Sequence, residues 1–203
     1  MNILHIDSSI NGKKSSSGHL SRAIVERLIT LQPTAVVVRR DLALHPLPYF
    51  DAGASGGIDA DVSGQLTTNT GGEPVEKHVL AEFMWADVIV VGAPMYNFGV
   101  PAQLKTWIDY LAVAGVTFRY TANGPEGLAG GRRVFIASSR GGMYGEGTPM
   151  AAMDHQESYL KAVFGFFGIA RIDVVRAEGM GLGGEAAASA IAFAEEAVRT
   201  VVL

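Results

Sequence analysis

Cysteine is absent from this sequence of 203 residues. Its absence excludes disulfides, thiolate nucleophiles, iron–sulfur clusters and cysteine-based zinc sites. The chain also lacks a strong excess of positive or negative charge, since its formal net charge is only -4 and no stripe of basic residues runs along it. Attraction to a phosphate backbone, the main source of nucleic-acid affinity, has no evident origin here, and we expect no nucleic-acid partner. Any redox chemistry must come from a bound cofactor.

Long hydrophobic runs are missing as well. No segment approaches the roughly 18 uninterrupted apolar residues of a membrane span, and the opening residues MNILHIDSS lack the basic region of a signal peptide. We therefore expect a cytoplasmic protein with no membrane partner. Apolar residues make up 48% of the chain, so residues 1–203 can bury a sizeable core as a single domain.

Short apolar, β-branched runs alternate with helical patterns along the chain. The five runs cover residues 3–7, 35–39, 87–93, 133–138 and 172–177, and helical spacing of apolar residues appears at 20–31, 74–85, 104–111, 160–167 and 187–201. Strands that are apolar on both faces and alternate with amphipathic helices indicate a parallel sheet covered on both sides. The prediction is a doubly wound α/β fold, a three-layer sandwich around a five-stranded parallel sheet of order 2-1-3-4-5.

Ligands in such sheets bind beyond the carboxyl ends of the strands, beside the point where the strand order reverses. The loops after the first, third and fourth strands are therefore the candidate site. The first loop, SSINGKKSSSGHL, places Ser15, Ser16 and Ser17 just before a helix. Unpaired N–H groups at a helix N-terminus attract anions, so these hydroxyls could help to bind a phosphate. The alternative is that Ser17 simply caps the helix.

The second loop, in VVGAPMYNFGVP, leaves a hydrophobic strand with two aromatic residues and an amide. Tyr96 and Phe98 can present apolar faces to a planar ring, while Asn97 can hydrogen-bond to ring heteroatoms. The alternative is that both aromatic side chains only pack against the helix that follows. The third loop, in IASSRGGMYGEG, has paired glycines that let backbone N–H groups approach a heterocycle, and Arg140 as a cation to stabilise negative charge on it. Together the three loops suit a phosphorylated planar ring, and they predict flavin mononucleotide (FMN).

The chain resembles the FMN-dependent NADH azoreductases, which also act as quinone reductases. The resemblance rests on SSINGKKSSS, APMYNFGVPAQLKTWIDYLAVAGVTFRYTANGPEGL and SRGG. It implies a flavodoxin-like fold, tightly bound FMN, and a homodimer with two FMN sites at its interface. It also implies that NADH or NADPH reduces quinones and aromatic azo compounds in two-electron steps of a ping-pong reaction.

The resemblance assigns roles to individual positions. Residues that would bind FMN are Ser9, Ser15, Ser16, Ser17, Met95, Tyr96, Asn97, Phe98, Ser139, Arg140, Gly141 and Gly142. Phe98, Phe118 and Tyr120 would form the substrate cavity. The flavin carries the chemistry, so no side chain is expected to be a catalytic acid or base and no metal is expected.

The sequence leaves two rival functions open. A flavodoxin-type electron carrier would pass electrons to partner proteins, but it usually needs a strongly acidic docking face and an exposed flavin edge. A hydrolase would need a nucleophile such as Ser8, Ser9 or Ser55, for which the sequence shows no matching base and acid. Segment 50–74, which lacks Lys and Arg, leaves its substrate contacts open.

Overall fold

The computed structural model describes residues 1–50 and 75–203. Five strands, β1 (Asn2–Asp7), β2 (Val36–Asp41), β3 (Val88–Pro94), β6 (Arg133–Ser139) and β7 (Arg171–Ala177), form one parallel sheet. Their order is β2-β1-β3-β6-β7. The predicted α/β fold and five-stranded parallel sheet are confirmed, but the numbering differs from 2-1-3-4-5. An antiparallel hairpin of β4 (Phe118–Thr121) and β5 (Gly124–Gly127), which is not among the strands that the sequence predicts, lies between β3 and β6 in the chain and shifts the numbering.

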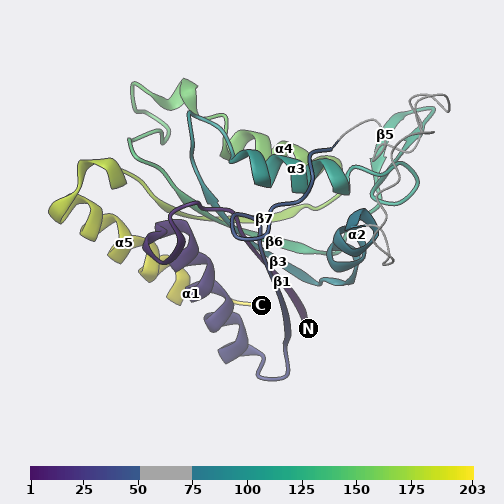
Figure 1. Cartoon of the computed structure of the whole chain (residues 1–203), viewed down its shortest axis with the longest axis horizontal. Coiled ribbons are helices and arrows are strands. Elements are labelled where there is room, and N and C mark those ends of the chain that lie inside the picture. Colours follow the sequence, from purple (N-terminus) through teal and green to yellow (C-terminus); the bar gives the residue numbers. More distant parts are fainter. Residues whose placement is uncertain (51–74) are drawn as a thin grey trace.

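Helices cover both faces of the sheet (Figure 1). On one face lie α1 (Ser16–Leu31) and α5 (Gly184–Arg199), and on the other α2 (Val75–Trp85), α3 (Ala102–Leu111) and α4 (Glu157–Phe166). The alternation of side chains along β3 produces this arrangement, because successive residues point to opposite faces. Ile89 and Val91 belong to the core under α2, α3 and α4, whereas Val88 and Val90 belong to the core under α1 and α5.

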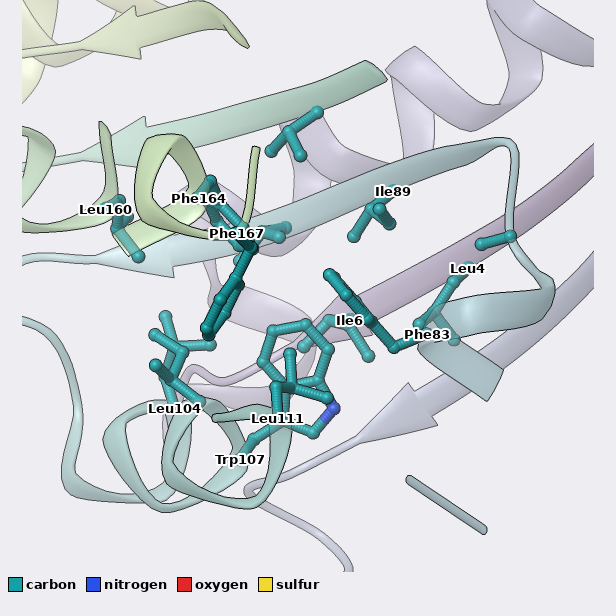
Figure 2. Packing of buried hydrophobic residues seen from close by; sticks show 14 of the residues in the cluster. Leu4, Ile6, Phe83, Ile89, Leu104, Trp107, Leu111, Leu160, Phe164 and Phe167 are labelled. Carbon is teal, nitrogen blue, oxygen red and sulfur yellow. The ribbon is translucent and has the colours of Figure 1, made fainter. Parts of the chain in front are cut away.

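Aromatic side chains lie in the middle of the larger core, as Figure 2 shows. The ring of Phe83 lies edge-on to Trp107 at 6.2 Å and to Phe167 at 6.0 Å between centroids, and all three side chains are buried. Each such burial stabilises the fold by roughly 1.5–3 kcal/mol. The contacts join α2 to α3 and to the end of α4, which form one layer over the sheet.

The carboxyl ends of β1, β3 and β6 lie side by side. Asp7 pairs in register with Gly92, and Pro94 with Ser139. The loops that leave these strands therefore start from one edge of the sheet, as the fold prediction requires. Among the described residues, no helix has the length and apolar character needed to cross a membrane.

Candidate functional site

The loop after β1 ends in a capped helix. Ser15, not Ser17, is the N-cap of α1: its Oγ accepts a hydrogen bond from the Gly18 N–H at 2.9 Å. The alternative that Ser17 caps the helix is therefore wrong. The Ser17 hydroxyl is fully buried and lies 3.1 Å from that of Ser15.

Free hydrogen-bond donors remain at this helix start. Within the described part of the chain, neither Ser16 N–H nor Ser17 N–H has an acceptor, and the half-buried Ser16 hydroxyl has no partner. A cavity of about 440 Å³ opens beside them. It is lined by Asp7, Ser9, Ile10, Gly12, Lys13, Ser15, Gly18, Arg22, Arg39, Asp41, Ala43 and Leu44. Unpaired N–H groups, hydroxyls and nearby cations make this end of the site suited to a phosphate.

The loop after β3 makes a tight turn. Tyr96 and Gly99 exchange two backbone hydrogen bonds, of 3.0 and 3.1 Å, around Asn97 and Phe98. Both central residues are left-handed, with φ of 47° and 71°, a conformation that is uncommon for residues other than glycine and that clusters at active sites and ligand-binding turns. The turn leaves the side chains of Asn97 and Phe98 exposed. This exposure does not fit the alternative in which Phe98 only packs against the helix that follows.

Tyr96 joins the second loop to the first. Its hydroxyl lies 3.3 Å from Ser9 Oγ and accepts the backbone N–H of Ile10 at 3.1 Å. Ser9 Oγ in turn accepts the N–H of Asn11 at 3.3 Å. The predicted phosphate end and the predicted ring wall are thus held together by side-chain hydrogen bonds.

The loop after β6 lies next to the second loop. Met95 donates its N–H to the carbonyl of Ser139 at 2.7 Å. Gly141 and Gly142 follow, and within the described residues their N–H groups have no acceptor, while their carbonyls accept the N–H groups of Gly181 and Gly179 at 2.9 Å. The turn is therefore anchored by its carbonyls and leaves its N–H groups available to a ligand.

Arg140 has a different place from the one predicted. Its guanidinium is fully buried and forms ion pairs with Asp154 at 3.1 Å, Glu157 at 2.5 Å and Glu178 at 3.3 Å. Its backbone N–H and carbonyl are also used, by Ala177 and Met180. These carboxylates neutralise the guanidinium charge inside the protein, so its side-chain contacts give no support to the prediction that this cation binds the cofactor ring. Arg140 instead supports the loop from below.

The carboxylates around Arg140 connect the loop to α4 and β7. Burial alone would raise the pKa of Glu157, but hydrogen bonds from Arg176 and the charges of Arg140 and Arg176 outweigh it and lower this pKa below its usual value. Asp154 accepts the N–H groups of Gln156 and Glu157 and so caps the start of α4. These partners lie up to 38 positions from Arg140 in the sequence, so no local pattern reveals the network.

A second buried cluster lies beneath the first loop and was missed by the sequence reading. Ser21 Oγ donates to Asp7 Oδ1 at 2.8 Å, and the buried His5 Nε2 lies 2.9 Å from Ser21 Oγ. Arg39 adds hydrogen bonds of 2.7 and 3.1 Å to Asp7 Oδ2. Burial raises the pKa of Asp7, but hydrogen bonds from His5, Arg39 and Ser21 outweigh it and lower the pKa from 3.8 to about 2. The cluster ties β1 to α1 and β2 directly below the serines.

Phe118 and Tyr120 do not lie beside these loops. Phe118 packs on Phe166 at the C-terminal end of α4, with 4.8 Å between ring centroids, and Tyr120 packs on Phe118 at 5.6 Å. The backbone N–H of His155, just before α4, bonds instead to the carbonyl of Phe98. The ten residues of α4, about 15 Å of helix, therefore separate the two groups within one chain.

The hydrolase alternative gains no support from the geometry. Ser8 is fully buried and donates to the carbonyl of Gly92 at 2.7 Å, while Ser55 and the rest of segment 51–74 lie outside the described residues.

Across residues 1–50 and 75–203, no group of three or more His, Asp or Glu side chains could hold a metal ion.

Comparison with known proteins decides the family. A family model described as having a flavodoxin-like fold matches residues 1–202. The chain belongs to this flavodoxin-like family. A relative from Sinorhizobium fredii (strain NBRC 101917 / NGR234), an FMN-dependent NADH:quinone oxidoreductase, is 52% identical over 198 residues, which are 98% of this chain and 95% of the relative. The resemblance noted in the sequence is confirmed.

Solved structures agree with this membership. An azoreductase from Bacillus anthracis str. Sterne superposes with a TM-score of 0.81 at 30% identity and covers 98% of this chain and 97% of its own. An FMN-dependent NADH-azoreductase from Bacillus anthracis str. Ames Ancestor, solved in complex with FMN, has a TM-score of 0.81 at 26% identity, with 98% of both chains covered. This flavodoxin-like chain is therefore similar over its whole length to enzymes named for FMN, NADH, quinones and azo compounds.

Proposed function

We propose that the chain is an FMN-dependent NADH:quinone oxidoreductase that also cleaves aromatic azo bonds reductively. The observation that carries the proposal is the convergence of three loops, after β1, β3 and β6, on one edge of the sheet. Each loop contributes different chemistry. The first supplies phosphate donors, the second an aromatic and amide wall, and the third a pair of backbone N–H groups.

The residues present fit FMN. A phosphate is matched by the free N–H groups of Ser16 and Ser17 and by the hydroxyl of Ser16. A planar heterocycle is matched by the left-handed turn at Asn97 and Phe98 and by the free N–H groups of the paired glycines. We infer that Ser9, Ser15, Ser16, Ser17, Met95, Tyr96, Asn97, Phe98, Ser139, Gly141 and Gly142 hold the cofactor within one domain of residues 1–203.

The chemistry that bound FMN supplies is two-electron transfer from NADH, or NADPH, to the acceptor. The protein orients the reactants and excludes water. In this proposal the Asn97 amide and the Gly141 N–H face the polar edge of the ring, where donors stabilise negative charge on it. Phe98, exposed on its turn, offers an apolar surface to a planar reactant. Arg140 acts indirectly, by fixing the backbone of the third loop.

The functional unit we propose is a homodimer with a site at each end of its interface. Within one chain, the length of α4 separates Phe118 and Tyr120 from Phe98. In the proposed dimer, the second copy brings these aromatic side chains to the acceptor. The exposure of Tyr120, Val116 and Phe166, at 76%, 37% and 36%, supports this proposal, because it leaves an apolar surface around the hairpin. We further propose that the enzyme acts in the cytoplasm.

The proposal is tested on the purified chain. The protein should be yellow, release FMN on denaturation, and give parallel initial-rate lines when NADH is varied at several quinone concentrations. A colourless chain that cannot be reconstituted with FMN would overturn the proposal. A flavin-bound chain that transfers electrons only to other proteins would favour the electron-carrier alternative.

A further inference from the structure

Tyr144 is an aromatic residue of the third loop to which the sequence reading gave no role. Its ring lies edge-on to Phe98, with 6.2 Å between centroids and an interplanar angle of 74°. Phe98 belongs to the proposed ring wall, so Tyr144 extends that wall into a corner made by two nearly perpendicular rings. The second ring comes from the loop after β6 and the first from the loop after β3.

The position of the Tyr144 ring is fixed from three sides. A Cβ added to Gly142 would lie 3.1 Å from Cε2 and 3.3 Å from the hydroxyl oxygen of Tyr144, so glycine at this position lets the ring pack closely on the loop backbone. The Arg140 guanidinium lies 5.9 Å from the ring centroid, within the range of a cation–π interaction. Phe98 completes the set. A ring held in this way presents its polar end at a defined place.

The backbone of Tyr144 is anchored by the same buried network. Its N–H donates to Glu178 Oε1 at 2.7 Å, and this oxygen also pairs with Arg140 at 3.3 Å. Thr148 closes the loop with hydrogen bonds to the carbonyls of Gly145 and Met143, at 2.8 and 3.1 Å. Arg140 and Glu178 are therefore positioning residues for Tyr144.

The Tyr144 hydroxyl, unlike its ring and its backbone N–H, makes no contact that would explain it. It has no hydrogen-bond partner within the described part of the chain, although the side chain is half-buried. A partly desolvated hydroxyl gains from a partner, and a phenol is a good donor to a carbonyl oxygen.

We propose that Tyr144 is a specificity-determining residue that donates a hydrogen bond to a carbonyl oxygen of the quinone, while Phe98 covers the quinone's apolar surface. This inference rests on the proposed quinone reductase activity and adds the residue that recognises the acceptor. It concerns binding alone and adds no proton or electron transfer to the reaction.

The test compares Tyr144→Phe with the parent FMN-loaded enzyme. The substitution keeps the ring and removes the hydroxyl, and kcat/KM for a benzoquinone should fall about 2- to 10-fold, the range expected for one neutral hydrogen bond. Turnover with ferricyanide, which has no carbonyl group, should stay unchanged, as should FMN affinity and the rate at which NADH reduces the flavin. Tyr144→Ala should lose more quinone activity, and Phe193→Ala, which removes an exposed ring from α5, should lose none.

Two results would overturn the assignment. One is an unchanged kcat/KM for benzoquinone in Tyr144→Phe. The other is a loss that appears equally with ferricyanide or in the reduction of the flavin by NADH, because such a loss would indicate a structural role. Failure of the parent enzyme itself to reduce quinone would instead reject the proposed function, so the two failures are distinguishable.

Discussion

The hydroxyl of Tyr96 lies 3.3 Å from the hydroxyl of Ser9 and joins the loop after β3 to the loop after β1. It also accepts the Ile10 N–H at 3.1 Å. Tyr96→Phe removes both interactions, each worth about 1 kcal/mol, so we expect the Kd for FMN to rise about 3- to 30-fold. Titration of the apo-protein with FMN, followed by flavin fluorescence, measures this change.

A matched control is Tyr49→Phe, which removes a hydroxyl from a side chain that is 82% exposed. Its FMN affinity should equal that of the parent chain. Equal affinities for all three proteins would show that the Tyr96 contact does not couple the two loops.

Ser15 and Ser16 are neighbours with separable roles. Ser15→Ala removes the N-cap of α1, so the free energy of unfolding of the apo-protein should fall by about 1 kcal/mol and FMN affinity should fall with it. Ser16→Ala removes a hydroxyl without a partner in the described residues, so it should weaken FMN binding alone. Urea unfolding and FMN titration of both variants check this, and a loss of apo stability in Ser16→Ala would contradict it.

Asn97 combines a backbone requirement with a functional amide. Asn97→Gly keeps the left-handed turn, where φ is 47°, and removes the amide. We expect the free energy of unfolding to stay within about 0.5 kcal/mol of the parent value, since glycine adopts this conformation freely. The reduction potential of the bound flavin should fall if Asn97 stabilises the negative charge of the reduced ring. An unchanged potential, measured by dye equilibration, would restrict Asn97 to a turn role.

The low pKa of Asp7 predicts how the free energy of unfolding depends on pH. Its folded pKa of about 2 lies below the ordinary aspartate pKa of 3.8, so its stabilisation is fully present above pH 4 and is lost as the pH falls through 2. Asp7→Asn should lower the free energy of unfolding by about 2 kcal/mol at pH 7, and by progressively less below pH 4. Urea unfolding between pH 7 and pH 3 measures the difference.

The control for Asp7 is Asp109→Asn, which breaks an exposed ion pair with Lys105. Such pairs contribute less than about 0.5 kcal/mol. Equal losses in the two variants, or a loss for Asp7→Asn that does not depend on pH, would contradict the assignment of its low pKa to the buried cluster.

Most of the fold could be predicted from the sequence because burial on both faces leaves a local signal. The apolar runs at 3–7, 87–93 and 133–138 match β1, β3 and β6 to within one residue at each end. The β4–β5 hairpin gave no such signal, since three of the four residues of β4 are exposed. Its strands form through pairing with each other rather than through burial.

The candidate site could be predicted in its loops but not in its side-chain directions. Gly, Ser and Asn-rich turns at strand ends are visible in the sequence, and the fold brings them together. The direction of Arg140 depends on Asp154, Glu157 and Glu178, which are distant in the sequence. Tyr144 was missed for the same reason, because its contact with Phe98 joins two loops 46 positions apart.

The central claim is that bound FMN carries electrons from NADH to quinone and azo acceptors. Anaerobic addition of stoichiometric NADH to the purified holoenzyme, followed by the visible absorption of the flavin, tests it most directly. We expect the flavin band to bleach, and to return when either a benzoquinone or an aromatic azo dye is added. A flavin that NADH does not reduce, or a reduced flavin that neither acceptor reoxidises, would reject the proposed function.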